Sequence, residues 1–308
     1  GADRIAHGEP IYGNFPDGIS DGDTYGPVNY YAYVPFELAF PWSGSWDDLP
    51  AAHAASIAFD LITLMGLFFL GRRIRPGPAG TRLGVIMAFA WAACPYTAFA
   101  LESNSNDILV SALVVGALLL VDSPVGRAGM VAVGTLAKFA PLALAPLFAV
   151  GVRAEPAAAK GRLGRHFAMP RPAPTALFAL AFALVGAALL AGPAIDPGLT
   201  TFWNRTVATQ ANRDSPFSVW GQVPSLGWLR TVVEAAVAGL ALLVAFAPRR
   251  RDLRQVAALG AAILIGVELT LDHWFYLYIP WFLPLFILAL ALGDGLPNRS
   301  FTGAPSQA

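Results

Sequence analysis

The stretch AGMVAVGTLAKFAPLALAPLFAV, residues 128–150, decides the fold that this sequence predicts. It is apolar except at Lys138, one of only two lysines in the chain. A charged side chain near the centre of a bilayer costs about 2.5–3.5 kcal/mol on insertion scales, so such residues usually mark function. The surroundings of Lys138 are therefore the first question that the sequence raises.

Composition places the chain in a membrane. It is 56% hydrophobic and only 13% charged, and its mean hydropathy is +0.56, whereas soluble domains are about 25% charged. The net charge of zero suggests no nucleic-acid partner. Cys94 is the only cysteine, which excludes an internal disulfide and a cysteine metal cluster. The chain opens at Gly1 inside a polar segment with no cleavable secretory signal, so we expect its true N-terminus to lie upstream.

Apolar runs of about 20 residues are long enough to cross a hydrocarbon core as helices. Seven predicted spans cover Ala51–Gly71, Leu83–Leu101, Asn106–Val121, Thr175–Ala194, Leu229–Ala247, Gln255–Leu271 and Trp274–Leu292. The fold class that we expect is an all-α polytopic membrane protein, with residues 51–292 as its transmembrane bundle. An eighth apolar segment, 128–150, needs separate treatment.

Arginine in short loops marks the cytoplasmic side. The arginines at 72, 73, 75 and 82 put the loop after the first span inside, so residues 1–50 form an outer loop. The same rule puts loop 195–228 outside, loop 151–174 inside as a flexible connection, and the polar tail 293–308 inside as a disordered segment. The localisation predicted is a multi-pass protein of the plasma membrane.

Alternation fails if residues 128–150 cross the membrane, because the basic loop 151–174 would then lie outside. A re-entrant hairpin resolves this conflict. Each half, 128–138 and 140–150, is too short to span alone, and Pro141 interrupts a straight helix. The hairpin lifts Lys138 to its tip, whereas a plain span with a basic outer loop is the alternative.

Three polar, aromatic pieces meet on the expected outer face, and they suit a sugar. They are residues 1–50, loop 195–228 and the turn 272–276, with Asn106 and Asp107 at the start of a span. Aromatic rings would cover the apolar faces of a sugar while amides and carboxylates hold its hydroxyl groups. The alternative for each aromatic is an interfacial position, where Trp and Tyr collect because they are amphipathic.

Each charged candidate also has a structural alternative. Lys138 either holds an anion, most simply a phosphate, or snorkels to an interface or pairs with Asp107 or Glu268. Asp107 either contacts ligand or caps its helix. His273 either binds a phosphate or a sugar or is only a turn residue, and the arginines of loop 195–228, Arg205 and Arg213, are otherwise solvated.

Other catalytic motifs are missing from the sequence. Asp21-Gly22-Asp23 has the D-x-D form that binds a metal–nucleotide in some soluble glycosyltransferases, but no nucleotide-binding motif surrounds it. The four histidines are scattered and no H-E-x-x-H occurs, which argues against a catalytic zinc. We expect no metal ligand set, and the sequence leaves the need for a divalent metal undecided.

The order of motifs resembles GT-C-type integral-membrane glycosyltransferases, and most closely family 87, which includes polyprenol-phosphate-mannose-dependent α-mannosyltransferases. The stretches that carry the resemblance are HGEPIYG at 7–13, TYGPVNYYAYVP at 24–35, the acidic position at 106–107, G-x-x-x-K-x-x-P at 134–141 and the aromatic run at 273–284. The likeness covers most of the chain through the order and spacing of loose motifs.

The resemblance implies transfer of a hexose, mannose in the closest family, from a polyprenyl-phosphate donor to a glycan or glycolipid acceptor on the outer face. It implies no cofactor beyond that donor, and membrane lipids as partners. Donor phosphate would be held by Lys138, Arg205 and His273, because fixed cations stabilise a leaving group that gathers charge. Sugar and acceptor would be held by Tyr25, Asn29, Asn106 and Asp107.

The base that takes the acceptor proton is the point where the chain departs from the family pattern. The catalytic aspartate of the family lies in the first outer loop, soon after the first span, and that position would fall upstream of Gly1. Asp23 is the local substitute. Two other functions remain: a transporter or flippase of a lipid-linked or small anionic solute, which suits an intramembrane lysine, and a scaffold that only presents its outer loops.

Overall fold

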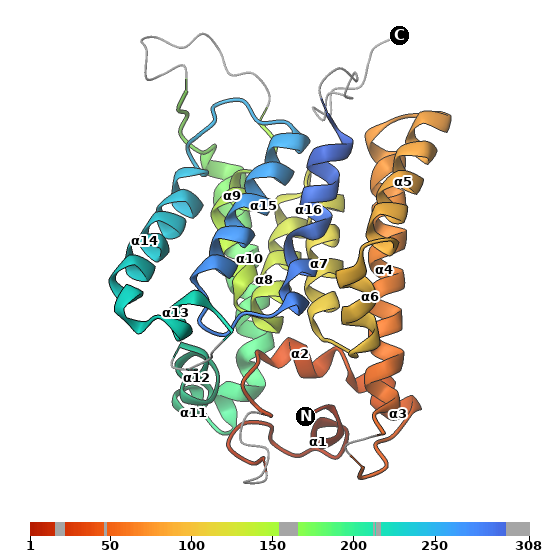
Figure 1. Cartoon of the computed structure of the whole chain (residues 1–308), viewed down its shortest axis with the longest axis vertical. Helices are drawn as coiled ribbons and strands as arrows, with labels where there is room; N and C mark the ends of the chain where they lie inside the picture. Colours follow the sequence, from red (N-terminus) through yellow and green to blue (C-terminus); the bar gives the residue numbers. More distant parts are fainter. Residues whose placement is uncertain (16–21, 46–47, 154–165, 212, 214–216, 294–308) are drawn as a thin grey trace.

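The computed structural model describes residues 1–15, 22–45, 48–153, 166–211, 213 and 217–293. Within these ranges the chain is helical, and a single β-bridge joins Arg153 to Arg251. The long elements form one bundle (Figure 1). They are α4 (Pro50–Ile74), α5 (Gly77–Ala92), α6 (Pro95–Glu102), α7 (Asp107–Leu119), α8 (Pro124–Ala137), α10 (Pro172–Ile195), α14 (Gly227–Leu243), α15 (Leu253–Thr270) and α16 (Ile279–Ala291).

The seven expected spans all correspond to helices of the bundle, but not all as single full-length ones. Among the described residues, α4, α10, α15 and the segment Pro224–Leu243 are long and apolar enough to cross a membrane alone. The expected span Leu83–Leu101 is instead two helices, α5 and α6, bent by 60°, because Pro95 cannot continue the preceding helix. The helices of the third and seventh expected spans, α7 and α16, have 13 residues each, or about 20 Å of helix.

The expected re-entrant hairpin is confirmed. Helix α8 ends at Ala137, and Lys138 is extended, with φ −140° and ψ 131°. The chain then returns as a 3₁₀ turn, Ala140–Leu144, and α9 (Ala145–Val150). The guanidinium of Arg127, near the start of α8, donates to the carbonyl oxygen of Phe148 at 2.5 Å, so both ends of the hairpin lie together.

Each helix of the bundle runs between two chemically distinct ends. The arginine end carries Arg73, Arg127, Arg153 and Arg251, and there Arg73 pairs with Asp122 at 2.7 Å. The loop end consists of the described residues 1–15, 22–45, 48–49, 103–106, 196–211, 213, 217–226 and 271–278, and it lies in the lower part of Figure 1. Its short helices are α1 (Ala2–Ala6), α2 (Pro27–Tyr31), α3 (Val34–Ala39), α11 (Leu199–Trp203), α12 (Thr209–Ala211) and α13 (Val219–Gln222).

This division follows the alternation predicted from arginine positions. The loop predicted at 151–174 leaves α9 and enters α10, which starts at Pro172, at the arginine end. Its residues 154–165 lie outside the described residues. The predicted tail lies outside them as well, from residue 294 onward.

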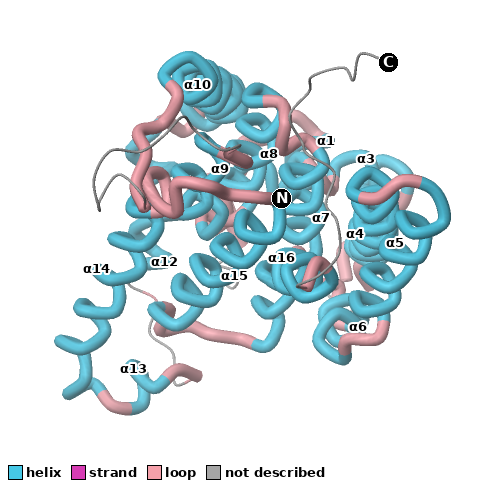
Figure 2. The backbone as a smooth tube through the Cα atoms, turned by 90° about the horizontal axis from the view of Figure 1, so that it is seen from above, coloured by secondary structure: helices cyan, strands magenta, loops and turns pink. Residues whose placement is uncertain are grey.

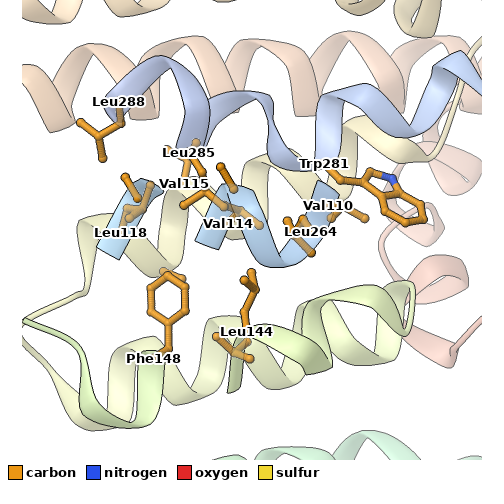
Figure 3. Close-up of a cluster of buried hydrophobic side chains, with 14 of the residues drawn as sticks. Val110, Val114, Val115, Leu118, Leu144, Phe148, Leu264, Trp281, Leu285 and Leu288 are labelled. Atoms are coloured by element: carbon orange, nitrogen blue, oxygen red, sulfur yellow. The ribbon is translucent and has the colours of Figure 1, made fainter. Parts of the chain in front are cut away.

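The core of the bundle forms around α7. Its buried face, Val110, Val114 and Leu118, packs against leucines of α15 and α16 and against the returning half of the hairpin (Figure 3). Helices α4 and α5 approach closely enough that a Cβ atom on Gly71 would stand 2.2 Å from the backbone nitrogen of Gly84. Small residues allow such contact between membrane helices.

Helices α10 and α14 lie at the edge of the bundle (Figure 2). Their apolar outer faces have few protein neighbours, and Leu184 and Leu242 are 62% and 63% exposed. Apolar surface of this kind is typical of helices that face lipid rather than a protein core.

Candidate functional site

Two cavities meet at Lys138. The larger, about 950 Å³, lies at the loop end and is lined by α1–α3, the 103–107 turn and residues 273–278. The second, about 700 Å³, lies between the hairpin, α14 and α15. Apolar side chains, most often alanine, make up most of its lining, which also includes Gln210, Arg230 and Asp272. Lys138, Tyr25, His273 and Tyr278 line both cavities, so these residues form the junction between them.

The Lys138 ammonium group forms a buried ion pair with Asp107. The two side chains are only 7% and 3% exposed, and Nζ lies 2.5 Å from Oδ1 of Asp107. The carboxylate also accepts hydrogen bonds from Trp281 Nε1 at 2.6 Å and from the Ser105 hydroxyl at 2.5 Å. Lys138 therefore pairs with Asp107 rather than with Glu268, and three donors stabilise the buried carboxylate.

Aromatic rings surround the rest of the ammonium group. Its nitrogen lies 5.0 Å from the ring centroid of Tyr25, 5.4 Å from that of Tyr278 and 5.5 Å from that of Trp281. An ammonium group has three N–H donors, and Asp107 accepts the only hydrogen bond that Lys138 donates within the described residues. Two donors therefore remain at the junction of the cavities.

Tyr25 reaches Lys138 because the backbone at the next residue, Gly26, lies directly against the end of α8. A Cβ atom on Gly26 would stand 2.0 Å from the carbonyl oxygen of Leu136, at the end of α8, so only glycine fits there. The Tyr12 hydroxyl donates to the carbonyl oxygen of Tyr25 at 3.0 Å. The Tyr30 hydroxyl donates to that of Gly22 at 2.9 Å, and burial raises the pKa of Tyr30, which keeps this donor protonated.

Four more predicted residues line the larger cavity. Asn29, Asn106 and Arg213 line the larger cavity. His273 lines both cavities, and its ring packs 4.7 Å from that of Phe275. The structure therefore brings together Tyr25, Asn29, Asn106, Asp107, Lys138 and His273, whose individual roles in binding stay predictions.

Asp23 and Arg205 lie elsewhere. Asp23 is fully buried. The guanidinium of Arg205 donates two hydrogen bonds to its carboxylate, from Nε to Oδ2 at 2.8 Å and from Nη2 to Oδ1 at 2.5 Å. The amide of Gly13 donates to the same carboxylate at 2.7 Å. Neither Asp23 nor Arg205 is among the lining residues of the two cavities.

The geometry therefore gives no support to Asp23 as the base or to Arg205 as a phosphate ligand. The two side chains form an ion pair with each other, and this pair joins the first loop to the segment after α11. The first aspartate of the D-x-D motif, Asp21, lies outside the described residues. No group of three or more His, Cys, Asp or Glu side chains that could hold a metal occurs in the described part of the chain.

Sequence reasoning missed three residues of the site. Trp281 supplies the indole donor to Asp107, and Tyr33 and Glu37 line the larger cavity. The signal for Glu37 was present, since it is a lone carboxylate between Phe36 and Leu38. Trp281 carried no comparable signal, because aromatic residues are common at the ends of membrane helices.

Comparisons with known proteins bear on the fold alone. No protein-family model matches the chain, and no curated protein sequence matches it either. The structure is similar to the crystal structure of ArnT from Cupriavidus metallidurans bound to undecaprenyl phosphate, with a TM-score of 0.59 and 16% sequence identity. The match covers 94% of this chain and 53% of that one, so this chain spans about half the length of ArnT. The fold expected from the sequence, an all-α polytopic bundle of GT-C type, is confirmed.

Proposed function

We propose that this protein is a membrane glycosyltransferase that moves a sugar from a polyprenyl-phosphate donor to a hydroxyl group of a glycan or glycolipid. The observation that carries the proposal is the position of Lys138, a buried ammonium group with two remaining donors. It lies where a cavity with many polar side chains in its lining meets a groove with fewer of them. An amphiphilic anion with a sugar on one side and a hydrocarbon tail on the other has this same order of parts.

The lipid tail would occupy the apolar groove. This cavity runs from the junction along the hairpin, past Leu142 and Pro146, and along α14 as far as Leu242. A groove between helices lets a lipid enter from the side, and each buried CH₂ contributes about 0.8 kcal/mol. The crystal structure of ArnT, which contains undecaprenyl phosphate, supports the same class of lipid here.

The phosphate would lie at the junction. Lys138 would donate to it, with His273 and the Tyr25 hydroxyl within the same lining. The leaving phosphate gains negative charge as the bond to the sugar breaks. A fixed cation in a largely dry site stabilises that charge better than water does, and this differential stabilisation lowers the barrier.

The sugar would project into the larger cavity, where Asn104 and Asn106 offer polar groups beside aromatic rings. We propose a hexose, and mannose in particular, because of the resemblance to family 87. The arginine end would face the cytoplasm by the positive-inside rule, so transfer would occur on the outer face of the plasma membrane.

A transporter of lipid-linked or anionic solutes is the second candidate. Glu268 favours it, since this carboxylate is only 4% exposed inside α15 and its Oε1 has no hydrogen-bond partner among the described residues. Intramembrane carboxylates often mark ion pathways. An enzyme forms a new glycosidic bond, however, whereas a transporter returns its solute unchanged, so mass spectrometry of the product separates the two.

The test uses the 308-residue chain in lipid nanodiscs, with undecaprenyl phosphate as the probe. Native mass spectrometry measures its binding to the unmodified protein, to Lys138→Gln and to the control Arg82→Met, which removes an exposed cation from α5. Glutamine keeps an N–H donor for Asp107, and a cooperative thermal unfolding transition of Lys138→Gln confirms that the variant is folded before its binding is measured. Loss of one charge-assisted hydrogen bond, about 1.5–3 kcal/mol, weakens binding about 10- to 100-fold.

A second measurement follows radiolabelled mannose from polyprenyl-phosphate mannose to octyl α-mannoside. We expect transfer by the unmodified protein and by Arg82→Met, and a large loss in Lys138→Gln. Equal affinity of Lys138→Gln and the unmodified protein for undecaprenyl phosphate would refute the proposal.

A further inference from the structure

We infer that Glu37 is the general base of the proposed transfer, in an acceptor subsite that it forms with Asn29 and Tyr33. This inference rests on the proposed function and adds two things to it: the residue that takes the acceptor proton, and an acceptor that presents several hydroxyl groups, such as a sugar ring.

Glu37 is a buried carboxylate with unused capacity. It lies in α3, is 8% exposed and lines the larger cavity. One of its oxygens, Oε1, accepts the backbone N–H of Trp42 at 2.6 Å, which fixes the side chain. The other oxygen has no hydrogen-bond or ion-pair partner within the described residues, so a ligand in the cavity can donate to it.

The other carboxylates that line this cavity differ from Glu37, because each has a basic partner. Asp107 is paired with Lys138, Asp3 lies 3.2 Å from His7, and Glu9 lies 3.4 Å from Arg4. Glu9 is also 54% exposed. Among the described residues, no basic side chain forms an ion pair with Glu37, although the α-ammonium group of Gly1 interacts with it electrostatically.

Two further polar atoms in the lining of this cavity independently indicate a ligand. The Asn29 side chain is 6% exposed, and its Oδ1 is buried with no hydrogen-bond partner. The Tyr33 hydroxyl is also buried without a hydrogen-bond partner among the described residues. The Tyr33 ring packs edge-on against that of Phe59, with centroids 5.5 Å apart. Buried polar atoms rarely stay unpaired in proteins, and all three residues line one cavity. Hydroxyl groups of an acceptor would pair both atoms.

The chemical step follows from these positions. The acceptor oxygen attacks the anomeric carbon of the donor and forms the new C–O bond. The bond between that carbon and the phosphate oxygen breaks, and its electron pair leaves with the phosphate toward Lys138. The acceptor proton passes to the free oxygen of Glu37 and from there to solvent, which restores the carboxylate.

The experiment compares Glu37→Gln with Glu102→Gln in the 308-residue chain. Glutamine keeps the carbonyl oxygen that accepts from Trp42 but cannot take a proton. Glu102 is an exposed carboxylate at the end of α6, at the same end of the bundle and outside both cavity linings. With polyprenyl-phosphate mannose and octyl α-mannoside, we expect kcat to fall about 100-fold or more in Glu37→Gln, with no change in Glu102→Gln.

Azide separates a base from a residue that only positions the acceptor. The azide anion carries no proton, so glycosyl azide formation needs no base, and we expect Glu37→Gln and the unmodified protein to form it at equal rates. A kcat in Glu37→Gln equal to that of the unmodified protein would overturn the inference. So would a loss of kcat that azide does not relieve.

Binding of undecaprenyl phosphate distinguishes this inference from the proposed function. Glu37→Gln should bind it as the unmodified protein does, because Glu37 does not line the lipid groove. If the unmodified protein neither binds the lipid nor transfers mannose, the proposed function fails and the role of Glu37 fails with it. If binding and transfer both occur and Glu37→Gln retains full kcat, only the role of Glu37 fails.

Discussion

Two ion pairs among the described residues each bury a carboxylate, but they differ in what they leave available. Asp23 and Asp107 are both buried, whereas Arg205 is 32% exposed and Lys138 only 7%. Arg205 donates to both oxygens of Asp23, to one of which the Gly13 amide also donates, and neither Asp23 nor Arg205 is part of the lining of either cavity. Lys138 meets Asp107 through one donor only, at the junction of two cavities. A buried ion pair therefore indicates a binding site when its cation keeps unused N–H donors that a cavity reaches. Otherwise it indicates a structural link between two segments, which we call a clasp.

The largest effect expected from this comparison is on stability, at the closed pair. Arg205→Met leaves Asp23 buried with only a backbone amide, and breaking a buried pair costs about 3–5 kcal/mol. The midpoint of thermal unfolding in nanodiscs should fall accordingly. Asp23→Asn combined with Arg205→Met should recover much of the loss, since no unpaired charge remains. Stability unchanged in Arg205→Met would show that the pair is not a clasp.

The second effect concerns ligand binding and sets the two pairs directly against each other. Lys138→Gln should weaken the binding of undecaprenyl phosphate about 10- to 100-fold. The matched variant Arg205→Gln should leave that affinity within about twofold, because the guanidinium lies outside both cavities. Isothermal titration of both variants gives the comparison, and equal losses in the two would erase the distinction drawn between them.

The third effect is smaller and concerns Trp281, which orients Asp107. Trp281→Phe removes the indole donor but keeps a ring near Lys138, and the loss of one hydrogen bond to a carboxylate costs about 1.5–3 kcal/mol at most. Unfolding in urea should report a loss within that range. Transfer should also slow, since Asp107 would then hold Lys138 less firmly. An unchanged rate together with lower stability would assign Trp281 a purely structural role.

The smallest effect belongs to the acceptor side. Tyr33→Phe removes one neutral hydroxyl that the acceptor would otherwise pair, and such bonds contribute about 0.5–1.5 kcal/mol. The KM for octyl α-mannoside should rise about 2- to 12-fold at unchanged donor affinity. A raised KM for the donor instead would move Tyr33 from the acceptor subsite to the sugar of the donor.

The hairpin shows how much of this fold the sequence predicts. Its turn point follows from Lys138 inside an apolar run, and its return follows from Pro141 and the basic loop beyond it. These are local signals, and local signals fix helix ends and membrane alternation. Pro95 carries an equally local signal for the break between α5 and α6. Hydropathy alone nevertheless predicts one long span over Leu83–Leu101, because it gives a single proline little weight.

Side-chain pairing across the bundle was much less accessible. Arg205 and Asp23 are 182 residues apart, and Trp281 and Asp107 are 174 apart. Neither periodicity nor charge count specifies which polar groups meet at such separations. The sequence therefore selected residues that gather at one end of the bundle, but it could not separate a clasp from a site.

The contact between Lys138 and a lipid-borne phosphate is the central claim, and the chain offers a direct way to measure it. It has only two lysines, so Lys160→Arg leaves Lys138 as a single ¹⁵N-ammonium signal in lysine-labelled protein. With undecaprenyl phosphate bound in nanodiscs, solid-state NMR should show ¹⁵N–³¹P dipolar coupling that corresponds to direct contact, with an N···O distance of about 2.7–2.9 Å. Saturated binding without coupling between that nitrogen and the phosphorus would contradict the account.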